Sequence, residues 1–473
     1  MADEVKLTGP GYPSPLAAMK GPREKLLYVP AIYTGTTVKK PDYLATVDVN
    51  PESPNFCKII HRLPMPYTGD ELHHTGWNAC SSCFHQPEKR RRHLILPALM
   101  SGRVYVIDTF SDPLAPKIHK VVESEEIVAK AGCTHPHTSH CLGSGEVMIS
   151  FMGDKEGKAR GSFLLLDDKF DVKGTWEKEE ERTDYGYDFW YQPYHNVMIS
   201  SEWGEPASFT KGFDPSLVDT KYGRCLHVWD WKERKHVQKI DLGVDGLIPL
   251  ELRFMHDPKK SIGFVGAALS SNVLQFYKAD NNEWKVKKVI DVPAKEVEGW
   301  ALPNMPSLIT DILLSLDDKF IYFANWLHGD IRQYDITDPD NPKLVGQLFT
   351  GGSIRKGGPV IVKGGEEQPE IPTVQGHELY GGPQMIQLSL DGKRIYVTNS
   401  LFSGWDNQFY PDMIKNGSYI LQIDVDTENG GLKINPDFYV DFSNEPDGPA
   451  LAHEIRYPGG DCSSDIWLVS EDN

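Results

Sequence analysis

The sequence predicts an all-β fold: one domain over residues 1–473, a seven-bladed β-propeller closed by N- and C-terminal strands in one blade. Two observations lead to this prediction. A hairpin pattern recurs along the chain at blade-like intervals, and the apolar residues follow the alternation of strands rather than the period of long amphipathic helices. Hydrophobic residues make up 40% of the chain and aromatic residues 11%, enough for an extensive core.

The repeating unit is a strand, a tight polar turn and a second β-rich strand. Residues 314–323 (LSLDDKFIYF) recur as residues 388–397 (LSLDGKRIYV), and each copy has the pattern of an antiparallel hairpin. One position in the following strand marks every copy, and it is occupied by Asp48, Asp108, Asp167, Asp230, Tyr277, Asp335 and Asp424. Intervals of about 50–60 residues, with four short strands each, are typical of propeller blades.

Two segments depart from the repeat. A polar, Gly-rich insertion at residues 357–376 explains the longest interval, and a short N-terminal extension covers residues 1–20. The stretch from Leu451 to Val469 is expected to add a strand beside the first blade and so fasten the ring, which removes exposed sheet edges. Two stacked sandwiches are the alternative, but they would not require seven similar hairpins.

The formal net charge of −18 disfavours nucleic acid as a partner, because phosphates would be repelled. The basic run at residues 89–93 is either a nuclear-localisation or lipid-surface patch or, more simply, a solvated loop between strands. No stretch approaches the roughly 20 apolar residues of a membrane span, so at most peripheral membrane association is expected. Seven scattered cysteines and the lack of a signal-like start predict a reducing, cytoplasmic location.

Histidines concentrate where the innermost strands are predicted. Six of the 16 histidines lie in three such segments, and the propeller would bring these segments to one channel. Imidazole suits Zn, Cu, Ni or Fe, and copper binds nitrogen donors most tightly. The candidate ligands are His73, His74, His137, His140 and His453, with the choice between His137 and His140 left open. The alternative is a set of hydrogen-bonded channel residues without a metal.

The cysteines allow several interpretations. Cys80 and Cys83 have the C-x-x-C spacing of redox motifs and of half a zinc site, but no βαβ pattern surrounds them. Cys141 is expected near the channel. Cys57 lies beside Lys58 and near His61, which would lower its pKa and give a reactive thiolate; a buried, inert thiol is the alternative.

Five strings are distinctive: Asp70–Asn78 (DELHHTGWN), His137–Cys141 (HTSHC), Gly186–Pro193 (GYDFWYQP), Asn325–Asp330 (NWLHGD) and His453–Cys462 (HEIRYPGGDC). They resemble the selenium-binding protein / methanethiol oxidase family, and the similarity extends from about Gly9 to Trp467. Animal relatives often carry a cysteine pair just before Gly9, where this chain has residues 5–8 (VKLT) instead. The motifs are long enough to be specific.

This resemblance implies an enzyme that oxidises methanethiol with O2 and water to formaldehyde, hydrogen sulfide and hydrogen peroxide at histidine-bound copper. The family's metal histidines match His73, His74, His137 or His140, and His453, and its selenium-binding thiol matches Cys57. The resemblance also implies that the protein is cytosolic, with nuclear and peripheral-membrane pools. Some relatives are linked to intra-Golgi transport.

Removal of a proton from the substrate's methyl group would fall to a carboxylate such as Glu71 or Glu454, by general-base logic. Two other functions stay open: a selenium or heavy-metal carrier that acts through Cys57, and a non-enzymatic scaffold that binds other proteins on one propeller face.

Overall fold

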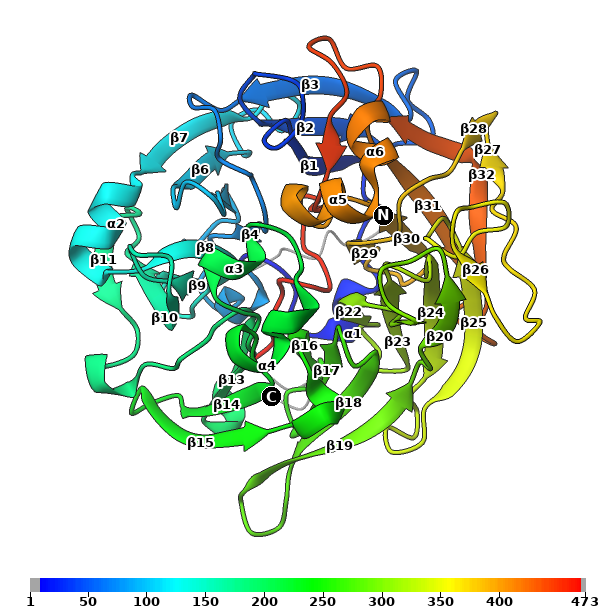
Figure 1. The fold of residues 1–473 in the computed structure, drawn as a ribbon. Helices are drawn as coiled ribbons and strands as arrows, with labels where there is room; N and C mark the ends of the chain where they lie inside the picture. Colours follow the sequence, from blue (N-terminus) through cyan, green and yellow to red (C-terminus); the bar gives the residue numbers. More distant parts are fainter. Residues whose placement is uncertain (1–8, 469–473) are drawn as a thin grey trace.

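Short β-strands joined by tight turns form nearly all of the computed structural model, which describes residues 9–468. The fold is all-β and propeller-like: seven four-stranded sheets in the described part of the chain follow one another around a ring (Figure 1). Neighbouring strands within each of these sheets run antiparallel, as consecutive hairpins require. The repeated hairpins of the sequence are therefore real structural units.

The sheets follow the order of the chain, except that one strand from the C-terminal region joins the first sheet. That sheet contains β1 (Leu26–Ile32), β2 (Tyr43–Asp48), β3 (Lys58–Pro64) and β33 (Leu451–Ala452). The second contains β4 (Gly76–Trp77), β5 (His93–Pro97), β6 (Val104–Asp108) and β7 (Lys117–Val122). The third contains β8 (Thr134–Cys141), β9 (Val147–Gly153), β10 (Ala159–Leu166) and β11 (Val172–Thr175).

The remaining four sheets continue around the ring seen in Figure 1. They are β12 (Phe189–Gln192), β13 (Val197–Ser200), β14 (Cys225–Asp230) and β15 (Lys235–Asp241); β16 (Pro249–Phe254), β17 (Ile262–Ala267), β18 (Asn272–Lys278) and β19 (Trp284–Asp291); β22 (Ile309–Leu314), β23 (Phe320–Asn325), β24 (Asp330–Asp335) and β25 (Lys343–Phe349); and β29 (Ile386–Leu388), β30 (Arg394–Val397), β31 (Tyr419–Val425) and β32 (Leu432–Asp441).

Smaller elements lie outside the seven four-stranded sheets. Two small sheets pair β20 (Lys295–Glu298) with β21 (Asn304–Met305) and β26 (Ile361–Val362), and β27 (Thr373–Val374) with β28 (His377–Glu378). The helices are α1 (Pro15–Ala18), α2 (Ser124–Ala131), α3 (Pro206–Phe209), α4 (Val218–Lys221), α5 (Ser403–Phe409) and α6 (Pro411–Asn416). Between residues 9 and 468 no helix has the length and apolar character needed to cross a membrane.

The predicted special segments fall partly within these elements. Residues 357–376, expected as an insertion, carry β26 and β27. Residues 9–20 of the expected extension include α1, whereas residues 1–8, and with them the departure at residues 5–8, lie outside the described part. Val469, the last residue of the expected C-terminal strand region, also lies outside it.

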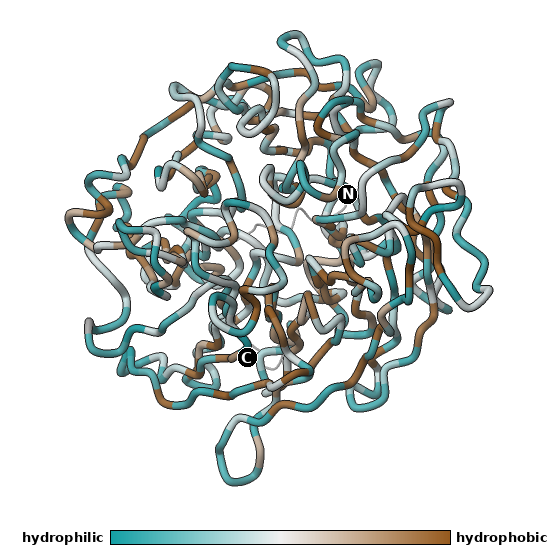
Figure 2. The backbone as a smooth tube through the Cα atoms, in the orientation of Figure 1, coloured by the Kyte–Doolittle hydropathy of each residue, from teal (hydrophilic) through white to brown (hydrophobic). Residues whose placement is uncertain are grey.

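Burial follows the position of each strand in its sheet. β2 and β16 are buried along their whole length, whereas the outer strand β15 alternates between exposed and half-buried residues. A strand packed on both faces is largely apolar, although β16 also carries Glu251 and Arg253, and an outer strand meets water on one face. Figure 2 shows the same division, with hydrophilic loops at the rim and hydrophobic stretches in the strands.

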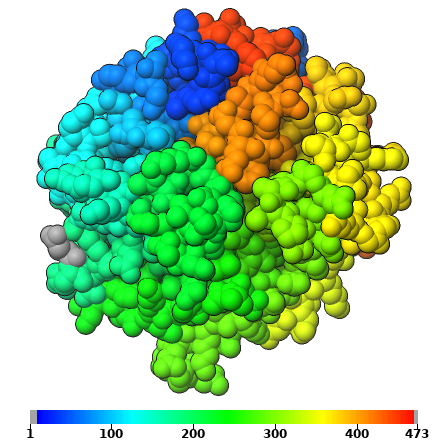
Figure 3. Space-filling view, in the orientation of Figure 1, coloured from blue at the N-terminus to red at the C-terminus, as the bar shows by residue number. Residues whose placement is uncertain are grey.

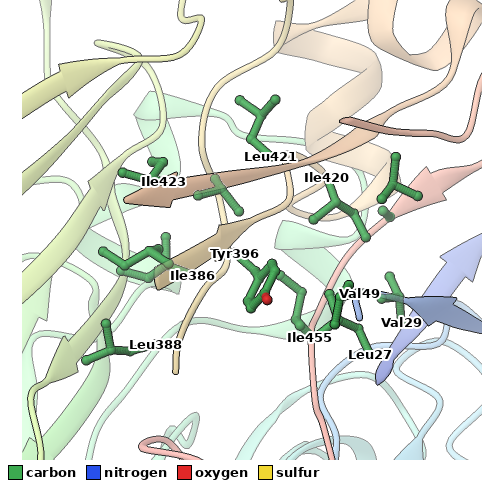
Figure 4. Packing of buried hydrophobic residues seen from close by; sticks show 14 of the residues in the cluster. Leu27, Val29, Val49, Ile386, Leu388, Tyr396, Ile420, Leu421, Ile423 and Ile455 are labelled. Atoms are coloured by element: carbon green, nitrogen blue, oxygen red, sulfur yellow. The ribbon is translucent and has the colours of Figure 1, made fainter. Parts of the chain in front are cut away.

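The two ends of the described chain meet in one sheet. β33 pairs with β1 through Ala31 with Ala452 and Ile32 with Leu451. A buried cluster extends across this junction, and Figure 4 shows Leu27 and Val29 beside Ile455, with Ile420 close by. The residues after β33 are thereby held toward the middle of the ring.

Candidate metal centre

Four buried imidazoles gather near the inner edges of the first three sheets. His73 and His74 precede β4, His137 lies in β8, and His453 directly follows β33. The ring centroids of His73 and His453 are 4.0 Å apart, and those of His74 and His137 are 3.9 Å apart. The expectation that segments around residues 73, 137 and 453 meet is confirmed.

Local irregularity lets two consecutive histidines face the same group. Residues 73–75 lie outside regular strand, between an isolated bridge at Leu72 and the start of β4. Glu71 has a φ of 53°, in the left-handed region, which turns the chain just before the pair. Strict strand alternation would have sent His73 and His74 to opposite faces.

β8 is also irregular. Its register with β9 shifts between Pro136 and Ser139, and His135 has a φ of 60°. As a result His135 hydrogen-bonds to Thr134 and packs near the Phe209 ring, away from the four imidazoles. His137 is the residue of β8 that reaches them.

The ring nitrogens form a set suited to a metal ion. One nitrogen each of His73, His74 and His137 lies within 4.8 Å of the others. The Nε2 atoms of His74, His137 and His453 are buried without a hydrogen-bond partner among the described residues. Buried polar atoms normally have partners. His74 and His137 belong both to the close group and to the unpaired nitrogens, which fits a nitrogen-bound metal.

Neighbouring groups hold these rings in orientation and in the neutral form. His453 Nδ1 donates to the Ser400 carbonyl at 2.8 Å, and His137 Nδ1 lies 3.0 Å from Thr138 Oγ1. Such contacts fix which nitrogen is left for a metal. Burial lowers the pKa of His453 to about 4 and that of His73 well below its ordinary value. Neutral imidazole is the form that binds metals.

Two buried carboxylates flank His74. Glu251 Oε1 in β16 lies 3.6 Å from His74 Nε2, and Glu454 Oε1 lies 3.8 Å from His74 Nδ1. Burial raises the pKa of Glu454 to about 7 and that of Glu251 well above the ordinary value. Thr75 donates to Glu454 through its backbone N–H and its hydroxyl, and Arg456 forms an ion pair with it.

Sequence reasoning did not single out Glu251 as a functional residue. Its place on an innermost strand was recognisable, but nothing in the local sequence shows that it faces a histidine some 180 residues earlier in the chain. The only available signal was a pair of charged residues, Glu251 and Arg253, on a buried inner strand, where unpaired charges are rarely tolerated.

Two predicted site residues lie in other surroundings. Glu71 is buried and accepts hydrogen bonds from Ser403 N at 2.8 Å and Ser403 Oγ at 2.6 Å, at the start of α5. His140 packs against the rings of Phe189 and Trp190, at centroid distances of 5.1 and 4.9 Å. The group of mutually close nitrogens contains His137 and not His140.

A small apolar cavity of about 10 Å³ adjoins His73. Trp203, Leu250, Leu401 and Trp405 contribute to its wall. This volume is near the least that admits one water-sized molecule. On the face shown in Figure 3, the green segment that includes α3 and the orange segment of α5 and α6 meet over the middle of the ring. The ring centroids of Trp203 and Trp405, which belong to these two segments, are 5.8 Å apart.

Cys57 lies just before β3, which forms the opposite edge of the first sheet from β33. Its sulfur donates to the Asp437 carbonyl at 3.7 Å. Burial, with added repulsion from the carboxylates of Asp48 and Asp437, raises the pKa of Cys57 to about 11. The expectation that Lys58 and His61 would lower this pKa is therefore wrong, because acids brought in by the fold and the loss of water outweigh them.

Comparisons with known proteins agree with this architecture. The family described as 56kDa selenium binding protein (SBP56) matches residues 6–468. A methanethiol oxidase of Xenopus tropicalis is 65% identical over 465 residues, covering 97% of this chain and 98% of the relative. Selenium-binding protein 2 of Mus musculus is 61% identical, covering 99% of this chain and 100% of the relative.

A solved structure is similar over the same length. The X-ray structure of a hypothetical selenium-binding protein from Sulfolobus tokodaii has a TM-score of 0.86 and 40% identity, covering 97% of this chain and 99% of that one. Family match, relatives and fold agree across nearly the whole sequence. The chain belongs to the 56kDa selenium binding protein family.

Proposed function

We propose that this chain is a methanethiol oxidase whose metal is held by His73, His74 and His137, with His453 beside them. The observation that supports it best is the buried group of close imidazole nitrogens on His73, His74 and His137, in which His74 and His137 have unpaired Nε2 atoms. Relatives between 60% and 65% identical carry the name methanethiol oxidase. The substrates would be methanethiol and O2, and the products formaldehyde, hydrogen sulfide and hydrogen peroxide.

The proposed metal is copper. The donor set is made of nitrogen, without a thiolate to favour structural zinc, and copper binds such sites most tightly among the divalent first-row ions. Bound there, copper would supply redox chemistry towards a soft sulfur substrate and O2.

The chain's own residues would bind the substrate and move a proton. The apolar wall beside His73 suits a methyl group and leaves room for little water. Glu454 is the favoured proton acceptor, since its carboxyl has a pKa of about 7, close to the pH at which a general base works best. Thr75 and Arg456 hold this carboxyl in place. Glu71 stays a second candidate, but its oxygens already accept from Ser403.

The test starts with protein purified without chelators and its metal content. With methanethiol and O2, we expect release of hydrogen sulfide and peroxide. His137→Ala should lose metal and turnover while the fold is kept. His140→Ala is the matched control, because it removes an equally buried imidazole from the same strand and should keep both. Protein fully loaded with copper that gives no product would refute the oxidase proposal.

Selenium binding through Cys57 is the second proposal, supported by the family description and the resemblance of this position. Labelling with selenite should be lost in Cys57→Ser while methanethiol turnover stays unchanged. Labelling that persists in Cys57→Ser would exclude this residue, and with it a carrier function based on it. If the protein is instead a scaffold, neither methanethiol turnover nor selenite labelling should be detected, and a protein partner should bind.

We also propose that the seven four-stranded sheets are the blades of one closed propeller, with β33 beside β1 as the fastening. Their order around the ring and the pairing of Ala31 with Ala452 support this. Cysteines placed at both positions should cross-link within one chain; failure to cross-link would contradict the closure. From the resemblance we propose a cytoplasmic location with nuclear and peripheral-membrane pools, which cell fractionation would test.

A further inference from the structure

Three cysteines surround the hydroxyl of Ser82, away from the carboxylates that flank His74. Cys80 Sγ lies 3.2 Å from Ser82 Oγ, and the sulfurs of Cys83 and Cys141 each lie 3.8 Å from it. All three side chains are buried and all three thiols are free. The C-x-x-C motif thus acquires a third thiol from a distant part of the chain.

Cys83 also contacts the chain directly after Cys141. Its sulfur donates to the Leu142 carbonyl at 3.5 Å. The contact from Cys141, with help from Ser82 and Lys89, lowers the pKa of Cys83, although burial opposes this. Burial raises the pKa of Cys141 well above its ordinary value. One sulfur is therefore ready to act as a thiolate, and its neighbour carries the proton.

The two thiols belong to the same two segments that carry the metal histidines. Cys83 lies nine residues after His74, beyond β4, and Cys141 ends β8, which also contains His137. These segments touch closely: a Cβ added at Gly76 would lie 2.4 Å from the Ser139 carbonyl oxygen. A bond between Cys83 and Cys141 would join the segments beside the metal centre.

The chain reaches the surface within two residues of Cys83. Cys83 is followed by half-buried Phe84 and exposed His85. Among residues 9–468 the group of mutually close metal-ligand atoms consists of His73, His74 and His137, and the three sulfurs form no such group.

We propose that Cys83 and Cys141 form a peroxide-reactive dithiol that oxidises to a disulfide between the two histidine-bearing segments. In the first step the Cys83 sulfur attacks one oxygen of the peroxide. The S–O bond forms as the O–O bond breaks, giving a sulfenic acid and hydroxide, and sulfur gives up two electrons to the peroxide. In the second step Cys141 sulfur displaces that oxygen, which leaves as water with the Cys141 proton. The sum is two thiols and one peroxide to one disulfide and two waters, because the first hydroxide takes up the proton that Cys83 lost.

The experiment adds hydrogen peroxide to reduced, full-length protein without methanethiol, so its outcome does not depend on the oxidase proposal. Remaining thiols are alkylated, the protein is digested without reductant, and linked peptides are identified by mass spectrometry with fragment ions that separate Cys80 from Cys83. We expect a Cys83–Cys141 link that dithiothreitol removes. A Cys80–Cys83 link, a Cys80–Cys141 link, or three alkylated thiols after peroxide treatment would each overturn the proposal.

Variants sharpen the assignment. Cys80→Ser is the matched control and should keep the link, whereas Cys83→Ser should abolish it. Cys141→Ser should leave Cys83 as a sulfenic acid that a dimedone probe captures. Circular dichroism reports the fold of each variant, and the wild-type peptide map decides the question even where a variant fails to fold. Loss of the link in Cys80→Ser would contradict the assigned pair.

Discussion

Replacing Asp465 by asparagine removes the negative half of a buried ion pair that fastens the C-terminal segment. Asp465 accepts from Ser81 N and Ser81 Oγ, each at 2.7 Å, and pairs with Arg91 at 2.6 Å. The two charged side chains are 1% and 6% exposed. Asparagine leaves the Arg91 charge buried without its partner, which typically costs about 3–5 kcal/mol.

This cost converts into a modest but measurable change in melting temperature. Unfolding entropy is about 2.1 cal/mol/K per residue, so the 473 residues of this chain give roughly 1 kcal/mol/K. Asp465→Asn should therefore lower Tm by about 3–5 °C in scanning calorimetry. The variant should also loosen Ser81, which lies next to the thiol cluster of Cys80, Cys83 and Cys141.

The control is an ion pair of the same type on the surface. Lys40 and Asp447 are 3.4 Å apart and more than half exposed, and such pairs contribute about 0–1 kcal/mol. Asp447→Asn should leave Tm nearly unchanged. Combining Asp465→Asn with Arg91→Met should recover much of the loss, since no charge then stays buried alone. If Asp465→Asn shifts Tm no more than Asp447→Asn, the reasoning is refuted.

Three other predictions concern acid stability, the metal and the packing of the two histidine-bearing segments. Burial opposes the charge of Asp465, but Arg91 lowers its pKa from the ordinary 3.8. The stabilisation by this carboxylate is therefore present above about pH 4 and is lost as the pH falls through the folded-state pKa. The difference in Tm between wild type and Asp465→Asn should narrow in acid, and a constant difference would contradict this. Glu251→Gln should weaken metal binding about 10- to 100-fold in a chelator competition, because one of the two carboxyl oxygens beside His74 is replaced by an amide group; an unchanged affinity would show that Glu251 does not support the site. Gly76→Ala should cost about 1–3 kcal/mol and weaken metal binding, since its Cβ would meet the Ser139 carbonyl at 2.4 Å. Gly143→Ala is its control, with no neighbour closer than 3.8 Å, and equal effects at both glycines would count against the packing argument.

Much of the fold was predictable because strands and turns are local. Alternating residues in segments such as 314–323 and 388–397 select hairpins without reference to the rest of the chain, and both segments are hairpin strands in the structure. The histidines at 73, 74, 137 and 453 were found for the same reason: their position relative to a hairpin is a property of the nearby sequence.

The finer assignments required the folded chain. Regular alternation cannot show that a bulge in β8 turns His137, but not His140, toward His73 and His74, because a bulge depends on the partner strand. Glu251 approaches His74, and Cys141 approaches Cys83, only after separate sheets pack together.

The cysteines show most clearly what the sequence determines and what the tertiary structure decides. The sequence determined that thiols stand at positions 57, 80, 83 and 141, and it predicted their neighbours along the chain. The tertiary structure decided their acidity. Burial raises the pKa of Cys57, with a smaller contribution from Asp437, 380 residues away, and Cys141 lowers the pKa of Cys83. Desolvation and charge act through space, over a few ångströms, whatever the distance along the chain.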